Sequence, residues 1–486
     1  MTLNKKILAA AIVGGLFATA AQAQVNLSAS GGSTPVTFAS ELVISNPTDG
    51  LALTNAANAL DLAANLRYNF SENEVRYARV ECSSNVRFLA GSAVALGAGT
   101  GVPGDLTGAT IGAINGLGTN VITFSITSGT GLLKSVNTLT INGNRNITAT
   151  TAGSCSYSLY DQPSQAAAGG TAGLITTVSG NYITFAQSYG LAVLNPRGAV
   201  ANVEASPSFS RFVSAAPTSS VDRGNLGSIV FDTRANVAVA QGTTATQPRL
   251  ANGVAATLAD LLDADSTHSI AGDFSAAANS NGTFSGAALS RVYFSVNADC
   301  STVDVAANAV TATSARFDTG PTAVNASLCY APRTGVAIPA SGYAQTFNAV
   351  STDTALYSVT SLGPVTLGSI TRNGTSLQAP FVQLPAGWLS RVVLTNTGTV
   401  ARPYTIAAQT EAGTTAALGS AATGTIPAGG TIVLSVSDIV TFTGNSRGTL
   451  VATVAGPTND IQGLYQIVNG VTGSIANTAM QRPGTN

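Results

Sequence analysis

The sequence predicts an all-β protein composed of several β-sandwich domains. Short runs rich in Val, Ile, Leu, Thr and Tyr alternate with polar residues, and clusters of Gly, Asn, Ser and Thr separate them, as in strands joined by tight turns. At 486 residues the chain is too long for a single hydrophobic core. We therefore expect roughly two to four β domains in succession.

The first 23 residues have the organisation of a secretory signal peptide. Asn4–Lys6 is a short basic start, Ile7–Thr19 is apolar but too short to span a bilayer, and Ala21–Ala23 offers small residues at a cleavage site. A retained short membrane anchor is the alternative interpretation. We expect residues 1–23 to be removed and the mature chain to be exported.

The mature chain carries little charge. Without Lys5 and Lys6, 19 basic residues stand against 22 acidic residues, which gives a formal net charge of −3. This near-neutral balance argues against nucleic acid as a partner. Lys134 is the one lysine after the signal segment. Because lysines on a surface discourage edge-to-edge association of strands, their scarcity favours packing against copies of the same chain.

Alternating apolar patterns predict strands along the whole chain. Leu66–Phe70 and Glu74–Cys82 are expected to pair around a turn at Ser71–Asn73. Leu51–Asn65 and Ala255–Leu262 show helical spacing of Ala and Leu, with a strand and a loop as the alternative for either. Further strands are predicted at Val121–Ile126, Val136–Ile141, Tyr182–Phe185, Ser228–Phe231 and Arg291–Val296.

Changes in composition predict three domains after the signal segment, an N-terminal β domain (24–200), a middle β domain (201–377) and a C-terminal β-sandwich (378–486). The clearest boundary lies at Asn373–Pro385, before the single tryptophan, Trp388. Gly-rich loops are expected at Gly91–Gly108, Ala166–Gly173, Ala277–Gly286 and Thr415–Gly424. The C-terminal domain has predicted strands at Ser390–Thr397, Tyr404–Gln409, Gly430–Val436, Gly448–Val454 and Gly463–Val468.

The four cysteines form two well-separated couples, Cys82 with Cys155 and Cys300 with Cys329. In an exported chain they are expected to form disulfides, and the sequential pairing keeps each bond inside one predicted domain. Loops of 73 and 29 residues would each stabilise the fold by roughly 4 kcal/mol on the chain-entropy model. A zinc site is disfavoured, because no cysteine has a second cysteine two to four residues away and the chain has one histidine.

One dense cluster of ionisable residues is a candidate metal site. Asp260, Asp263, Asp265 and Asp273 offer oxygen ligands at close spacing, which could bind Ca²⁺. The spacing does not match an EF-hand loop. A polar turn with helix-capping aspartates is the competing interpretation, and it is the one we favour.

The sequence offers few groups for catalysis. It contains one histidine, His268, and six glutamates. His268 has Asp265 and two serines nearby, but no nucleophile motif lies beside it, and nothing selects a pair of acids for a glycosidase. We expect a protein that is not an enzyme and that uses no cofactor, with Ca²⁺ as the one exception considered.

Two turn motifs in the C-terminal domain resemble a known group of proteins. Arg391–Gly398 reads RVVLTNTG, and Gly424–Thr431 reads GTIPAGGT. These segments resemble the Ig-like modules of bacterial cell-surface proteins, in which an N-x-G turn and an I-P-A-G turn flank strands of a sandwich. The lysine-poor chain rich in Thr, Ala and Gly is also similar, as a whole, to bacterial surface-layer (S-layer) proteins. Anchoring repeats and acidic calcium-binding repeats, which many S-layer proteins carry, are not found in this sequence.

The resemblance implies a multidomain, Ig-like β-sandwich protein located at the bacterial cell surface. It implies a structural protein that self-assembles into a layer or filament, with copies of itself and other outer cell-surface components as partners. The alternative is a secreted adhesin or carbohydrate-binding protein that uses exposed tyrosines such as Tyr157, Tyr160 and Tyr330. Aromatic residues make up 6% of the chain and form no tyrosine–tryptophan cluster, which favours the structural role.

Overall fold

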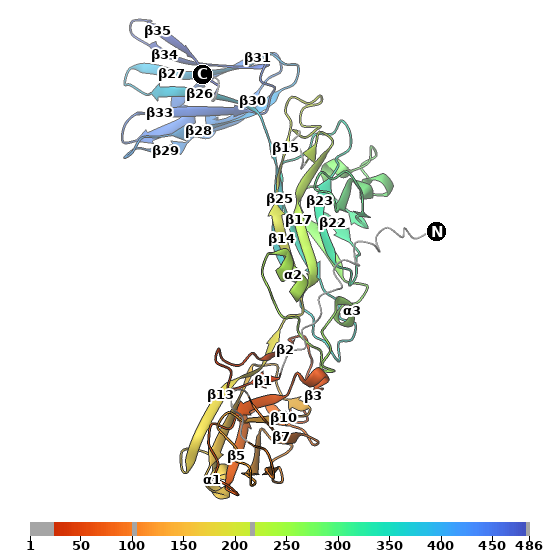
Figure 1. Cartoon of the computed structure of the whole chain (residues 1–486). Helices are drawn as coiled ribbons and strands as arrows, with labels where there is room; N and C mark the ends of the chain where they lie inside the picture. Colours follow the sequence, from red (N-terminus) through yellow and green to blue (C-terminus); the bar gives the residue numbers. More distant parts are fainter. Residues whose placement is uncertain (1–23, 100–104, 214–218, 483–486) are drawn as a thin grey trace.

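The protein is built almost entirely of β-sheets. The computed structural model describes residues 24–99, 105–213 and 219–482, so the predicted signal peptide (1–23) lies outside the described residues. About 47% of the chain is strand and about 8% is helix, which confirms the all-β prediction. Figure 1 shows the sheets following one another along an elongated, curved molecule, with the N-terminal strands at one end and the C-terminal sandwich at the other.

The N-terminal part contains three sheets, and most of their strands pair with partners that are distant in the sequence. The sheet orders are β2-β13-β12-β5-β9-β8, β1-β4-β10-β7 and β3-β11-β6. One short helix, α1 (Pro163–Ala168), and a 3-10 turn at Ala56–Asn58 accompany them. The strands are β1 (Val25–Asn26), β2 (Val36–Ala39), β3 (Leu51–Leu53), β4 (Leu62–Asn65), β5 (Val75–Cys82), β6 (Val86–Phe88), β7 (Ala93–Gly97), β8 (Thr110–Ile111), β9 (Val121–Thr127), β10 (Thr138–Asn142), β11 (Arg145–Ile147), β12 (Gly153–Tyr160) and β13 (Leu174–Ala186).

The middle part contains two larger sheets. Their orders are β14-β17-β23-β19-β20, with β16 paired to β17, and β15-β25-β24-β18-β22-β21. The helices are α2 (Arg234–Ala240) and α3 (Leu258–Leu261), and 3-10 turns lie at Ser275–Ala277 and Gly286–Arg291. The strands are β14 (Tyr189–Pro196), β15 (Gly198–Ala201), β16 (Ser219–Ser220), β17 (Arg223–Thr233), β18 (Thr267–Ala271), β19 (Val292–Ser295), β20 (Val305–Ala306), β21 (Ala309–Val310), β22 (Ser314–Phe317), β23 (Val324–Tyr330), β24 (Ser341–Asn348) and β25 (Leu362–Arg372).

The C-terminal part contains two four-stranded antiparallel sheets and a two-stranded ribbon. The orders are β26-β33-β28-β30, β31-β27-β34-β35 and β29-β32. A short helix, α4 (Val436–Ile439), and a 3-10 turn at Ser420–Ala422 complete this part. The strands are β26 (Thr375–Gln383), β27 (Trp388–Asn396), β28 (Arg402–Gln409), β29 (Thr415–Leu418), β30 (Thr423–Ile426), β31 (Gly430–Ser435), β32 (Val440–Thr443), β33 (Arg447–Val454), β34 (Ile461–Asn469) and β35 (Ile475–Ala479).

Alternating residues explain why these segments form strands. In β9 the sequence VITFSIT buries every second side chain, so that Ile122, Phe124 and Ile126 enter the core while the Thr and Ser between them stay half-buried. One apolar core runs from Val25 to Ile370 through the N-terminal and middle sheets. A second core, from Leu377 to Met480, belongs to the C-terminal strands alone.

Sheet membership changes before β14 and again at β26, and the division into three domains stays a prediction. β14, which ends before residue 200, already pairs with β17 of the middle sheets. β26 begins at Thr375 and pairs with β33 of the C-terminal sheets. The C-terminal part contacts the middle part through a hydrogen bond of 2.7 Å, which the Thr458 N–H donates to the Glu204 carboxylate. Independent folding of each domain stays a prediction.

Local predictions succeeded for most strands and failed for several segments. All the predicted C-terminal strands lie within or closely overlap strands of the structure. Leu51–Asn65 is not a helix but β3, a 3-10 turn and β4, and Leu66–Phe70 is not a strand. The predicted loop at Thr415–Gly424 contains β29 and the start of β30, and Gly91–Gly108, part of which lies outside the described residues, contains β7. In Ala255–Leu262 only Leu258–Leu261 is helical.

Candidate functional site

The first cysteine couple joins two central strands of the largest N-terminal sheet. Cys82 ends β5 and Cys155 lies in β12, directly opposite it in the antiparallel register. Their sulfur atoms are bonded, and both side chains are almost fully buried. The bond therefore fastens two neighbouring strands at a position where they already pair.

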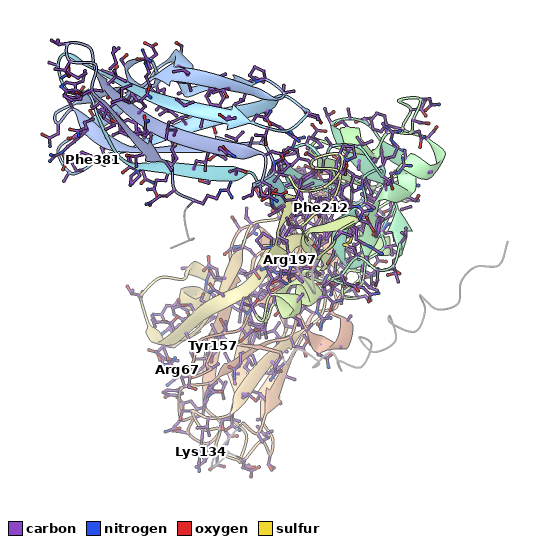
Figure 2. The ribbon with its side chains drawn as sticks, turned by 90° about the horizontal axis from the view of Figure 1, so that it is seen from above. Arg67, Lys134, Tyr157, Arg197, Phe212 and Phe381 are labelled. Carbon is purple, nitrogen blue, oxygen red and sulfur yellow. A yellow bond between two sulfur atoms is a disulfide. The ribbon has the colours of Figure 1, made fainter. Side chains whose placement is uncertain are left out.

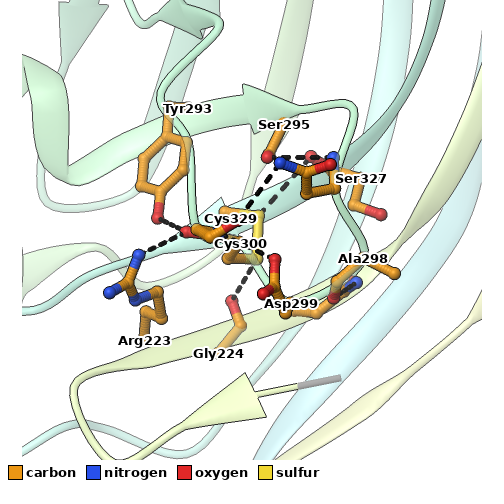
Figure 3. The surroundings of a disulfide bond; sticks show 12 residues. Arg223, Gly224, Tyr293, Ser295, Ala298, Asp299, Cys300, Ser327 and Cys329 are labelled. Carbon is orange, nitrogen blue, oxygen red and sulfur yellow. Dashed lines mark hydrogen bonds between the residues drawn. A yellow bond between two sulfur atoms is a disulfide. The ribbon is translucent and has the colours of Figure 1, made fainter. Parts of the chain in front are cut away.

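The second couple joins a loop to a strand. Cys300 follows β19 and is bonded to Cys329 in β23. The carbonyl oxygen of Cys300 accepts hydrogen bonds from the Tyr293 hydroxyl at 2.8 Å and from Arg223 Nη1 at 2.7 Å (Figure 3). No cysteine among the described residues is free. The pairing in the structure is the sequential one: one bond joins two neighbouring strands of a sheet, and the other joins a loop to a strand.

Three of the four aspartates proposed as calcium ligands accept hydrogen bonds within local turns. Asp260 accepts a hydrogen bond from the Thr257 N–H at 2.9 Å and closes a capping box at the start of α3. Asp263 accepts from the Asp265 N–H at 3.0 Å, and Asp273 accepts from the Ser275 N–H at 2.9 Å. These are the hydrogen bonds of polar turns and helix caps.

The aspartates do not converge on one point. Among the described residues, no group of three or more His, Cys, Asp or Glu side chains could hold a metal ion. A calcium site formed by these four residues within one chain therefore has no support in the structure.

His268 is a core residue. It is fully buried on β18, with its ring centroid 5.1 Å from that of Phe231 and 4.9 Å from that of Phe347. Gln345 Nε2 lies 2.6 Å from His268 Nδ1, and burial lowers the pKa of His268 to about 4. A G-x-S-x-G sequence does occur at Gly444–Gly448, but it lies in the turn from β32 to β33, far along the chain from His268. In the described part of the chain, the contacts of His268 are with Gln345 and with the rings of Phe231, Phe294 and Phe347.

The tyrosines proposed as an exposed ligand-binding set are not exposed. Tyr157, Tyr160 and Tyr330 keep 0%, 3% and 0% of their surface accessible. Tyr157 lies within the N-terminal sheets (Figure 2). β12 and β23 are interior strands of six-stranded sheets, and they end in runs of buried residues, Tyr157–Tyr160 and Ser327–Tyr330. The prediction of exposed tyrosines was wrong.

Exposed apolar residues gather instead on the outer face of the C-terminal sheet β31-β27-β34-β35. The antiparallel registers place Val433, Val393, Leu464 and Ala479 in one row across this face. A second row contains Leu389, Val468 and Ile475, and Ile475 is 58% exposed. Arg391 is the one charged side chain on the face within the described strands.

The two edge strands of this sheet are unprotected. β31 (GTIVLS) and β35 (IANTA) contain neither a charged residue nor a proline, and all five residues of β35 are exposed. By contrast, the edge strand β26 of the opposite sheet carries Pro380 and a register irregularity between Ala379 and Val382. Prolines, charges and bulges are the usual means by which proteins block edge-to-edge pairing, and β31 and β35 lack all three.

β35 was not predicted from the sequence. The segment Ile475–Ala479 has no aromatic residue and two alanines, so its alternation is weak. The turn at Val471–Gly473 after the predicted strand Gly463–Val468 was the available signal, because a tight turn at the end of one strand often leads into a second.

Comparison with known proteins identifies the family to which this chain belongs. A family model described as S-layer protein Slr4 matches residues 78–469. The chain belongs to the Slr4 family of S-layer proteins. Membership makes it a structural protein of the cell surface and not an enzyme, as the composition predicted.

Other comparisons add little to the Slr4 family assignment. No curated protein matches the chain. A crystal structure of a protein from Corynebacterium diphtheriae, described as membrane anchored, aligns with 87% of this chain and 84% of its own at 8% identity and a TM-score of 0.19. A similarity this low supports no conclusion about fold or function. Within the described residues, no helix is long and apolar enough to cross a membrane.

Proposed function

We propose that the mature chain self-assembles into an extracellular layer or filament through lateral contacts between β-sheets. The observation that carries the proposal is the pair of uncharged, unprotected edge strands on the C-terminal sheet, β31 and β35. Open edges present backbone donors and acceptors that a further strand can satisfy. The Slr4 family match supports the same role, since the family is one of S-layer proteins.

The low charge of the chain also supports assembly. A formal net charge of −3 on 463 mature residues leaves little long-range repulsion between copies. Lys134, the one mature lysine, lies at the periphery of the N-terminal strands, away from the C-terminal sandwich (Figure 2). Components of the outer cell surface are the further partners we propose, because a layer must be held to the cell.

An adhesin remains the competing function, but the tyrosines proposed for its ligand site are buried. Tyr157, Tyr160 and Tyr330 are buried and cannot stack on a sugar. Among the large apolar residues that are exposed, Phe381 and Trp388 retain aromatic surface, at 52% and 38%. They are the remaining candidates for carbohydrate contact.

Electron microscopy of the purified mature chain tests the proposal. We expect ordered sheets or filaments to form as the protein is concentrated. The experiment is run with calcium and with a chelator, because a strict need for calcium would restore Asp260, Asp263, Asp265 and Asp273 as ligands between copies. If the chain stays monomeric at high concentration under both conditions and binds a glycan array specifically, the layer proposal is wrong and the adhesin function is supported.

A further inference from the structure

We propose that β35 pairs in antiparallel fashion with β35 of a second copy of this chain, about a two-fold axis at Asn477. The inference rests on the proposed assembly and names one of its contacts. This pairing would join the sheet β31-β27-β34-β35 of one copy to the same sheet of the second copy, as one continuous sheet across the axis.

The backbone of β35 has its open hydrogen-bonding groups at alternate residues. The Met480 N–H donates to the Gly463 carbonyl, and the Ser474 carbonyl accepts from the Asn469 N–H, so even-numbered residues face β34. On the opposite edge, Gln481 exchanges two hydrogen bonds with Gln378 of β26. In an antiparallel ladder these directions alternate, so the N–H and C=O groups of Ile475, Asn477 and Ala479 point away from β34.

These three residues form a self-complementary edge. Turning the strand about Asn477 places Asn477 opposite its own copy and Ile475 opposite Ala479. All three positions then become hydrogen-bonded pairs of an antiparallel ladder, and the open donors and acceptors of both copies are satisfied. A two-fold contact must be self-complementary in this way, because the same surface serves on both sides.

The side chains on the outer face match across the same axis. The apolar row that contains Leu464 and ends at Ala479 would continue into Ile475 and Val468 of the second copy. The polar row of Arg391, Gln466 and Asn477 would continue into Asn477 of the second copy. Apolar residues therefore meet apolar residues and amides meet amides, and no charged side chain lies on β35 to oppose the contact.

The open stretch has defined ends. The turn at Val471–Gly473 precedes it, and beyond Ala479 the outer edge is occupied by the pairing of Gln481 with Gln378. The register cannot extend past Ala479 on either copy, which limits slippage. This limit favours the register centred on Asn477 over alternatives in which the strands slide along each other.

A charge-reversal pair at the axis tests the contact. Asn477→Lys or Asn477→Asp places two like charges opposite each other, and we expect each variant of the mature chain to dimerise at least about tenfold more weakly than the wild type in sedimentation experiments. An equimolar mixture of the Asn477→Lys and Asn477→Asp chains should recover association, because opposite charges then meet. Only a contact of residue 477 with residue 477 of the other copy gives this rescue.

Val433→Lys is the matched control. Val433 is 58% exposed on β31, at the other edge of the same sheet, and the variant adds the same charge. Dimerisation unaffected by Val433→Lys but weakened by Asn477→Lys supports the proposal. The reverse result, or equal behaviour of both variants, would overturn it in favour of a β31 contact or of no contact through this sheet. Circular dichroism of each variant checks that the strands remain folded.

The outcome separates this inference from the proposed function. If the wild-type chain never associates, the assembly proposal itself fails. If the wild type forms layers and the two Asn477 variants form them equally well, assembly stands and the β35 contact is wrong. Asn477→Cys gives a second readout: paired residues of an antiparallel ladder have Cα atoms about 5.5 Å apart, within disulfide range, so mild oxidation should yield a covalent dimer that Val433→Cys does not form.

Discussion

At the scale of single residues, Arg145 shows how this protein buries charge. Its side chain is fully buried. Nη1 donates to the Gly143 carbonyl at 2.8 Å, and Nη2 donates to the carbonyls of Ile141 at 3.0 Å and Leu60 at 3.3 Å. The guanidinium also lies 4.9 Å from the ring centroid of Phe88. The cation thus fastens loops of the N-terminal sheets through backbone carbonyls, which suits the planar fork of arginine.

Replacing this side chain should destabilise the N-terminal part strongly. Arg145→Ala leaves a cavity and several buried carbonyls without donors, and we expect a loss of about 3 kcal/mol or more in the free energy of unfolding. Arg87→Ala is the control, because Arg87 lies opposite the neighbouring Asn146 but makes a hydrogen bond to Thr48 near the surface. That variant should lose less than about 1 kcal/mol. Chemical denaturation followed by circular dichroism compares the two, and equal losses would contradict the assigned role of Arg145.

His268 should make stability depend on pH. Burial among phenylalanines lowers its pKa to about 4 from the ordinary value of 6.5. Above pH 6.5 the imidazole is neutral in both states. Below that pH the unfolded chain binds a proton that the folded chain does not, so stability falls as the pH drops towards 4.

Between pH 7 and about 5 this loss should reach about 2 kcal/mol. His268 is the one histidine of the chain, so no other histidine contributes in this window. His268→Leu should flatten the pH dependence there, whatever its effect on stability at pH 7. Denaturation midpoints at several pH values measure the slope, and an unchanged slope in the variant would assign the dependence to other groups.

At the scale of elements, the sequence predicted strands best where one face of a sheet is buried and the other is not. Alternation then appears directly in the residues, as in β9 and in β27 with its burial of Val392 and Leu394. The turn motifs at Asn396–Gly398 and Pro427–Gly429 also end strands in the structure, since β27 stops at Asn396 and β31 starts at Gly430. In these places the residues of the segment itself were sufficient to predict the strand and its end.

The failures have a common physical cause, which is pairing between distant segments. Leu51–Asn65 has the composition of a helix, yet β3 pairs with β11 and β4 pairs with β10. Ala57 and Asn58 between them adopt positive φ angles of 52° and 58°, which interrupt any helix. The buried tyrosines were misjudged for the same reason, because a sequence does not reveal which strands will lie inside a sheet. The open edge of β35, where we propose the contact between copies, depends on the order of strands in the sheet and could not be predicted from the sequence for the same reason.

The sheet order also predicts where the C-terminal part can be cut. β26 places Leu377, Ala379 and Val382 in the C-terminal core, with 2% or less of each exposed. A fragment of residues 373–486 retains this strand and should unfold cooperatively by itself. A fragment of residues 386–486 lacks it and leaves β33 with an open edge, so we expect no cooperative transition. Thermal unfolding by circular dichroism distinguishes them, and a disordered 373–486 fragment would show that the rest of the chain completes this core.

At the scale of the whole molecule, the scarcity of charge should make assembly insensitive to salt. Contacts between uncharged strands depend on backbone hydrogen bonds and apolar area, which screening does not weaken. Raising sodium chloride from about 50 to about 500 mM should therefore change the protein concentration at which assembly begins by less than about threefold. Light scattering measures this onset. A steep dependence on salt would indicate that arginine–carboxylate contacts between copies drive assembly instead.

The two disulfides also determine how the molecule responds to tension. Cys82–Cys155 encloses 73 residues and Cys300–Cys329 encloses 29. Fully stretched, these loops would lengthen the chain by about 250 Å and about 100 Å, and the covalent bonds withhold that length from a pull applied at the two ends. The C-terminal sandwich has no cysteine and no such restraint. We therefore expect the C-terminal sandwich to be the part whose whole length a pull at the two ends can extend, whereas the N-terminal and middle parts each keep one covalently closed loop.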